Sequence, residues 1–238
     1  MKNWLDRTSL MLGDEKLNKL KTSHILVIGL GGVGAYAAEL ICRAGVGEMT
    51  IVDGDVVDVT NRNRQLPALI SNIGKPKAEV LAARFLDINP DLNLHVINEY
   101  LQEEQLISVL EKTKYDYVVD AIDTLAPKVS LIQQCVLKNL PVVSSMGAGG
   151  KFNPMDVRTS DIKKSFNCRL AKQLRKRLHR LGITTGITVV FSPEEVDPSR
   201  VRIEESLNKK SAVGTISYMP PLFGCHVAAA VIRAIVGE

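Results

Sequence analysis

The chain has 238 residues, of which 45% are hydrophobic and 24% charged, and this balance is typical of a soluble globular protein. The N-terminus lacks the apolar stretch of a secretory signal, and no apolar run reaches the roughly 18 residues of a membrane span, so we expect a cytoplasmic protein without a membrane partner. The four cysteines stand far apart and form no CxxC pair, which argues against a zinc site or a redox dithiol.

Apolar stretches alternate with helical periodicity through the first part of the chain. This alternation predicts strands at residues 24–28, 48–52, 93–97, 117–121 and 141–145, and helices at residues 33–44, 75–88, 103–112 and 127–139. Strands separated by helices form a mostly parallel sheet with helices on both faces. The sequence therefore predicts an α/β fold of the Rossmann-like type, in which ligands bind at the carboxyl ends of the strands.

The pattern is less regular beyond residue 150. It predicts a helix at residues 163–181, a strand at 187–191, a loose segment at 208–221 and an apolar helix at 223–236. Because this half is short and rich in loops, we expect it to complete the same core rather than build another. We interpret residues 1–238 as a single domain, with a nucleotide-binding half at 1–150 and a substrate-binding half at 151–238.

A glycine-rich turn joins the first predicted strand to the first predicted helix. Gly29 permits a tight turn, Gly31 lets the backbone approach a phosphate, and Gly34 lets the helix pack close to the strand. The helix N-terminus then directs free N–H groups and its positive dipole end at an anion. The turn therefore predicts a nucleotide site.

Charged residues follow the second predicted strand. Asp53 and Asp55 lie where an acid usually accepts hydrogen bonds from a ribose hydroxyl, with Asp53 the better candidate and a solvated turn the alternative for Asp55. Arg64 and Lys77 come next, and two cations beside a phosphate site suit a triphosphate better than a dinucleotide. Surface cations are the alternative for both.

Two acids end the fourth predicted strand on the same side of the sheet. Asp123 is placed to hold Mg²⁺ that bridges phosphates, since a hard ion prefers carboxylate oxygen. A helix cap is the alternative for Asp123. Asp120 is expected to cap a turn or to orient a neighbour.

One short segment carries the positive excess of the chain. Residues 163–180 hold eight of the 30 Lys and Arg residues and no Asp or Glu, which leaves 22 basic against 26 acidic residues elsewhere. Lys172, Arg175, Lys176 and Arg177 are expected to project from the helix face opposite the leucines. This basic face favours contact with a polyanion, and a solvated face is the alternative.

These motifs occur together in a known order and spacing. The segments are Gly29-Leu-Gly-Gly-Val-Gly34, Asp53-Gly-Asp55, Asn61-Arg-Asn-Arg64-Gln65, Gly74-Lys-Pro-Lys77 and Asp120-Ala-Ile-Asp123. The chain resembles the adenylate-forming superfamily of ubiquitin-activating enzymes and sulfur-carrier activators. It is most similar there to the tRNA threonylcarbamoyladenosine dehydratases, over nearly its whole length.

The resemblance implies a role for each matching residue. Gly31, Gly32 and Gly34 would lie under the nucleotide phosphates, Asp53 would hold the ribose, Asn61, Arg64 and Lys77 would bind the triphosphate, and Asp123 would hold Mg²⁺. Arg7 matches an arginine that relatives reach across a homodimer interface into the neighbouring site. The basic helix would contact the tRNA substrate, because phosphate contacts supply affinity and position.

The reaction that the resemblance implies is an ATP-dependent dehydration. The threonyl carboxylate of threonylcarbamoyladenosine in tRNA would be adenylated and then attacked from within the same modification, with loss of water. The alternative is adenylation of the C-terminal glycine of a ubiquitin-like sulfur carrier, against which the missing CxxC pairs count. A sulfur-transfer protein is a candidate partner. Two hypotheses come from other functional classes: an NAD-binding oxidoreductase and a non-catalytic scaffold.

Overall fold

The structure is a computed structural model that describes residues 3–203 and 211–238. The strands are β1 (His24–Ile28), β2 (Glu48–Val52), β3 (Asn93–Ile97), β4 (Tyr117–Asp120), β5 (Val142–Ser145), β6 (Arg158–Asp161), β7 (Thr188–Phe191), β8 (Val201–Ile203) and β9 (Ser211–Val213). The helices are α1 (Asp6–Leu12), α2 (Asp14–Lys21), α3 (Gly34–Arg43), α4 (Lys77–Ile88), α5 (Glu103–Lys112), α6 (Leu125–Leu137), α7 (Arg169–Arg180) and α8 (Met219–Val236).

Seven strands form one sheet in the order β3-β2-β1-β4-β5-β7-β6. Every neighbouring pair in it is parallel except β6 and β7, which are antiparallel. The α/β fold is thereby confirmed. The C-terminal half adds β6, β7 and α8 to the same sheet and core, also as predicted.

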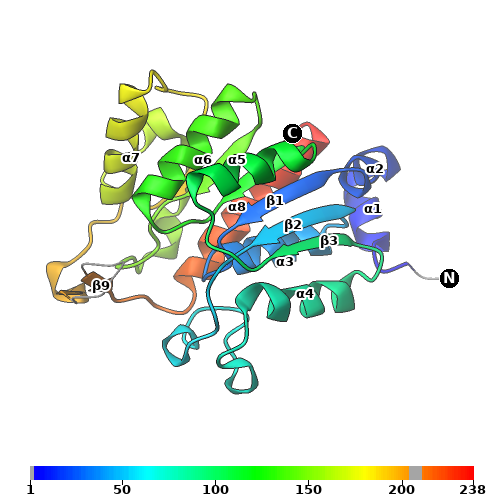
Figure 1. Cartoon of the computed structure of the whole chain (residues 1–238), viewed down its shortest axis with the longest axis horizontal. Coiled ribbons are helices and arrows are strands. Elements are labelled where there is room, and N and C mark those ends of the chain that lie inside the picture. The colour runs from blue at the N-terminus through cyan, green and yellow to red at the C-terminus, as the bar shows by residue number, and fades with distance from the viewer. Residues whose placement is uncertain (1–2, 204–210) are drawn as a thin grey trace.

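Helices cover both faces of the sheet (Figure 1), and the central strands β1, β4 and β5 are buried along their whole length. In β1, Ile25 and Val27 pack in the core layer shared with α3, α4 and α8. Leu26 and Ile28 point the other way, into the layer shared with α5, α6 and α7. This alternation follows from the two-residue period of a strand, and it explains why β1 is a continuous apolar run.

The long apolar helix α8 is central to the core. By length and composition it is the one helix of the described ranges that could cross a membrane. Its Phe223, Val227 and Val231 are instead buried in the core layer between the sheet and α3. At Gly224 an added Cβ would lie 2.7 Å from the carbonyl oxygen of Val33, so the glycine allows α3 and α8 to touch.

Several boundaries differ from the sequence predictions. The helix predicted at residues 163–181 begins only at Arg169, because Asp161 caps a 3-10 turn at Ile162–Lys164 and Asn167 adopts a φ of 49°. The helix predicted at 223–236 begins earlier, at Met219, with prolines in the first turn where no N–H is needed. The segment 208–221 was predicted to be loose. Its residues 208–210 lie outside the described ranges, and within the remainder β9 pairs with β8.

Candidate nucleotide-binding and catalytic site

The glycine turn after β1 is packed against the neighbouring strands. Gly29 has a φ of 91° and donates its N–H to the Val52 carbonyl over 2.8 Å. A Cβ on Gly29 would lie 2.7 Å from the Ala121 carbonyl oxygen, and one on Gly34 would lie 1.8 Å from the Gly29 carbonyl oxygen. Both glycines are therefore required by backbone packing, as the motif predicts.

Gly31 and Gly32 have different surroundings. A Cβ on Gly31 would meet nothing nearer than the Gln65 side chain, 3.8 Å away, so this residue borders open space. A Cβ on Gly32 would lie 2.9 Å from the Pro220 side chain, so Gly32 is needed to seat the start of α8. Gly31 is thus the glycine at which a ligand phosphate has room to approach the backbone.

This contrast gives a paired prediction. Gly34→Ala should lower the free energy of unfolding by at least about 3 kcal/mol, because its methyl group overlaps backbone. Gly31→Ala should leave the melting temperature unchanged but weaken ATP binding about tenfold or more, since its methyl group occupies the phosphate approach. Calorimetric melting and ATP titration check both, and equal effects of the two variants on melting would contradict the assignment.

Asp53 and Asp55 organise the loop that follows β2. Asp53 accepts the Leu30 N–H at 2.6 Å and the Asp55 N–H at 2.8 Å, so it joins the glycine turn to the end of β2. Burial raises the pKa of Asp53, an effect opposed by the charge of Lys77. The buried Lys77 ammonium lies 2.7 Å from Asp55 Oδ2. Asp55 therefore holds Lys77 in the candidate crevice, the region beyond the carboxyl ends of the strands that also carries Gly31, Arg64 and Asp123.

Tyr100, which the sequence analysis missed, joins this group. Its hydroxyl hydrogen-bonds to Asp55 Oδ1, and this bond is the main cause that raises the pKa of Tyr100 to about 12. The charges of Asp53 and Asp123 raise it further, so these carboxylates also act on the phenol. Tyr100 follows the carboxyl end of β3, and that position is the signal that could have revealed it.

Arg64 and Asp123 lie near each other in the same region. Burial lowers the pKa of Arg64, and the nearby Asp123 carboxylate raises it. Arg64 Nη1 donates to the Thr60 carbonyl at 2.9 Å, while the Asp123 carboxylate is exposed. Asn61 Oδ1 accepts the Asp58 N–H at 3.2 Å, which makes Asn61 part of the loop's own capping as well as a predicted phosphate ligand.

The chemistry of these side chains is compatible with nucleotide phosphates and a hard metal ion. The Oε1 atom of Gln65 is buried beside Gly31 and has no hydrogen-bond partner in the described ranges, so it is available to a ligand. Arg64 and Lys77 supply cations, and Asp123 supplies the exposed carboxylate. Mg²⁺ usually takes one or two protein carboxylates together with substrate phosphates, so this donor set suits it.

The sequence matches the ThiF family over residues 5–238. The chain belongs to the ThiF family.

Two relatives and one solved structure define its place in that family. The ThiF-family chain is 38% identical over 221 residues to the tRNA threonylcarbamoyladenosine dehydratase of Bacillus subtilis, covering 93% of this chain and 87% of the relative. The crystal structure of the E. coli tRNA N6-threonylcarbamoyladenosine dehydratase in complex with ATP matches with a TM-score of 0.87 and 33% identity, covering 97% and 93% of the two chains. Molybdopterin-synthase adenylyltransferase of Haemophilus influenzae is 35% identical over 126 residues, only 53% of this chain and 51% of the relative.

A buried ion pair between α6 and β4 lies next to the crevice segment of this ThiF-family protein. Lys128 Nζ lies 2.7 Å from Asp120 Oδ2 and 3.1 Å from Ser144 Oγ, and it also donates to the Ser145 carbonyl at 3.0 Å. The side chains of Lys128 and Asp120 are fully buried. The network ties the carboxyl ends of β4 and β5 to α6, and so it positions the segment that carries Asp123.

Removal of this lysine should be costly. We expect Lys128→Met to lower the free energy of unfolding by about 3–5 kcal/mol, because Asp120 would keep an uncompensated charge in the interior. Lys138→Met is the matched control, since the Lys138–Glu111 pair is partly exposed and worth at most about 1 kcal/mol. Urea unfolding of both variants measures the difference, and similar losses would contradict the supporting role.

The basic helix α7 presents most of its predicted face to solvent. Leu174 and Leu178 are buried, whereas Lys172, Lys176 and Arg177 are exposed. Arg175 is half-buried. Arg175 Nη1 donates to the Ser165 carbonyl at 2.8 Å and to the Ser165 hydroxyl, which holds the segment before α7 against the helix.

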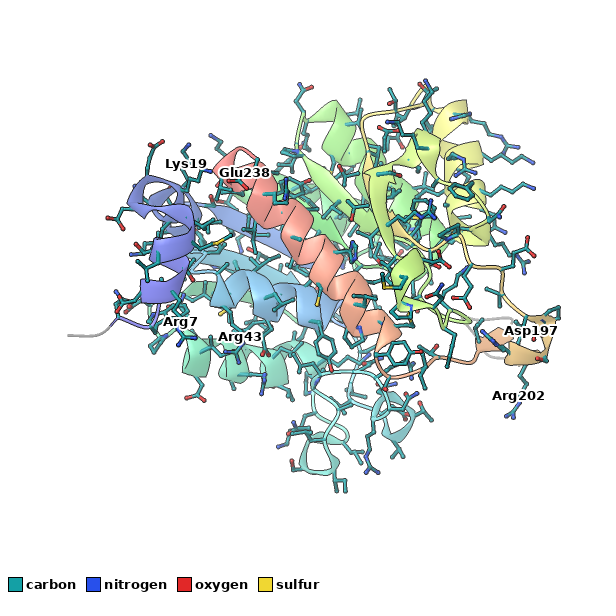
Figure 2. All side chains as sticks on the ribbon, turned by 180° about the vertical axis from the view of Figure 1, so that it is seen from behind. Arg7, Lys19, Arg43, Asp197, Arg202 and Glu238 are labelled. Atoms are coloured by element: carbon teal, nitrogen blue, oxygen red, sulfur yellow. The ribbon has the colours of Figure 1, made fainter. Side chains whose placement is uncertain are left out.

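Arg7 does not reach the crevice of its own chain. It lies beside Arg43 on the far side of the molecule, where both border a surface hollow of about 390 Å³ (Figure 2). Arg43 is the last residue of α3, and the glycine turn lies at the start of the same helix. The ten helical residues between them span about 15 Å. At this distance Arg7 contributes no atom to the crevice of its own chain.

Proposed function

We propose that this ThiF-family enzyme catalyses the ATP-dependent dehydration of threonylcarbamoyladenosine in tRNA. The observation that carries the proposal is the match to dehydratases along nearly the whole chain, including one solved with ATP. The crevice residues described above support it. We place the nucleotide-binding half at residues 1–150 and the substrate-binding half at 151–238, and we expect the enzyme to act in the cytoplasm.

The proposed roles of the site residues come from the resemblance. Gly31 offers its backbone to the phosphates, Gly32 and Gly34 shape the turn beneath them, and Asp53 accepts from the ribose. Asn61, Arg64 and Lys77 bind the triphosphate. Asp55 keeps Lys77 in place through the 2.7 Å ion pair and does not need to touch the nucleotide.

The mechanism needs positioning and positive charge rather than a protein nucleophile. The threonyl carboxylate attacks the α-phosphorus in line, and pyrophosphate leaves. Arg64 and Lys77 stabilise the charge that develops on the phosphate oxygens. Mg²⁺ held by Asp123 would add charge stabilisation when bound. The acyl-adenylate is then attacked from within the modified adenosine, AMP departs, and a ring closes.

The exposed cations of α7 are the proposed tRNA contact. Lys172, Lys176 and Arg177 lie together on one solvent-facing side of a helix without acidic residues. Phosphate contacts of this type give affinity and position but carry no sequence information. We exclude Arg175 from this surface because Ser165 engages it.

We also propose a homodimer in which Arg7 enters the crevice of the other copy. Leu10 and Met11 on α1 are 87% and 83% exposed, and they lie on the helix that carries Arg7. Covering these side chains with a second copy would remove apolar surface from water. A sulfur-transfer protein is a further proposed partner, on the resemblance alone.

The test is ATP cleavage with defined acceptors. Purified enzyme with ATP, Mg²⁺ and tRNA carrying threonylcarbamoyladenosine should release pyrophosphate and AMP in proportion to the modified tRNA. The same tRNA without the threonylcarbamoyl group should release neither. Pyrophosphate release that requires a sulfur-carrier protein and does not depend on tRNA would contradict the proposal. It would establish adenylation of a sulfur carrier instead.

A further inference from the structure

Three ligand-type side chains meet at the amino end of the sheet, opposite the nucleotide crevice. His24 begins β1, Glu48 begins β2, and His95 lies in β3. The register pairs His24 with Glu48 and Thr50 with His95, so neighbouring strands bring these residues to one place. One nitrogen or oxygen of each side chain lies within 4.8 Å of the others.

The distances within this cluster are short. Glu48 Oε1 is 3.4 Å from His24 Nδ1 and 2.8 Å from His95 Nε2. The carboxylate thus stands between two imidazole nitrogens. The arrangement combines residues from three strands that are far apart in sequence, and the sheet register fixes it.

His24 is buried and held in one orientation. Only 4% of the residue is exposed, its Nε2 lies 2.9 Å from Thr50 Oγ1, and its ring centroid lies 4.5 Å from that of Tyr115. Its Nδ1 has no hydrogen-bond partner in the described ranges, although Glu48 is near. When Nε2 donates to Thr50, Nδ1 directs a lone pair at the cluster, and leaving such a buried atom unused costs free energy.

We propose that His24 Nδ1, Glu48 and His95 Nε2 bind one divalent transition-metal ion of the Zn²⁺ class. Two imidazoles and a carboxylate form a donor set that Zn²⁺ takes in proteins. Zinc–ligand distances of about 2.0–2.2 Å place tetrahedral ligand atoms about 3.3–3.6 Å apart. The 3.4 Å between Glu48 and His24 matches this spacing, and the 2.8 Å between Glu48 and His95 has to widen when an ion binds. Mg²⁺ and Ca²⁺ prefer oxygen ligands and are disfavoured. Water completes the coordination.

The proposed ion has a structural role. His24 and the nucleotide turn lie at opposite ends of β1, whose five residues span about 16 Å at 3.3 Å each. β3 is the edge strand of the sheet, and three of its five residues, Asn93, His95 and Val96, are exposed. A metal bound to all three strands clamps this edge to β1 and β2. The inference is independent of the proposed dehydratase activity.

Zinc titration of the full chain tests the site. The protein carries Cys225→Ser to remove its exposed thiol, is stripped with a chelator, and is titrated with Zn²⁺ against a chromophoric competitor. We expect one ion per chain and a higher melting temperature when it is bound. His95→Ala and Glu48→Gln should each weaken binding at least about tenfold, the loss that even an outer partner of a metal site causes.

His179→Ala is the matched control, because His179 is an exposed histidine on α7, and it should bind Zn²⁺ like the parent. ATP binding should be the same in all variants, which shows that each is folded. Absence of saturable one-to-one binding in the parent would overturn the proposal. Parental affinity in both His95→Ala and Glu48→Gln would overturn it as well.

Discussion

Asp123→Asn should reduce ATP cleavage by about 10²–10³-fold, the loss seen when a single charge-stabilising group is removed from a site of this kind. Asp123 is exposed beyond the end of β4, so the substitution should not alter the melting temperature. The variant removes the carboxylate proposed to hold Mg²⁺ and leaves the shape of the side chain intact. Pyrophosphate release at saturating ATP and tRNA measures the effect.

Asp91→Asn is the control for this experiment, since Asp91 is also an exposed loop acid but follows α4 at the other end of the sheet. It should retain full turnover. Lys77 is a less direct probe than the sequence suggested, because the buried Lys77 ammonium also neutralises Asp55, and its loss would disturb folding. Equal turnover in Asp123→Asn and Asp91→Asn would rule out the assigned role of Asp123.

Reversing the charge of the exposed α7 face should have the second largest effect. The triple variant Lys172→Glu, Lys176→Glu and Arg177→Glu should weaken tRNA binding by at least about tenfold at low salt and leave ATP affinity unchanged. If these side chains contact phosphates, the slope of log K against log salt should become less negative by about 0.7–0.9 per lost contact. Filter binding across a salt series measures both quantities.

A control of equal charge change separates local contact from general electrostatics. Lys19 and Lys21 on α2 and Lys114 before β4 are exposed cations. Helix α2 lies across the molecule from α7 (Figure 1). Replacement of the three lysines by Glu should alter tRNA affinity much less. If both triple variants lose affinity equally, α7 is not the binding surface.

The strands of the first half could be predicted because each is a short apolar run bounded by a turn. β1 through β5 lie where the alternation placed them, within one residue at their ends. The start of α7 could not be predicted from leucine spacing, because it depends on the Asp161 cap and on the backbone of Asn167. The edge strand β6 is polar, and only its pairing with β7 defines it.

In the candidate site, too, residues with a local sequence signature could be predicted, and residues that depend on long-range contacts could not. Gly29, Gly34 and Asp53 have local signatures, and the packing of the two glycines agrees with the roles expected for them. The ribose contact of Asp53 stays a prediction. Lys128 and Tyr100 were missed because each reads as an ordinary surface residue until the fold brings it to a carboxylate. A buried acid such as Asp120 needs a counter-charge, and that requirement is the only sequence hint of Lys128.

Mass analysis of tRNA nucleosides after treatment with the enzyme, ATP and Mg²⁺ tests the central proposal most directly. We predict that threonylcarbamoyladenosine loses the mass of one water, that the change requires ATP, and that it fails in the Asp123→Asn variant. An unchanged nucleoside mass with the active parent enzyme, under conditions where ATP binds, would contradict the proposed function.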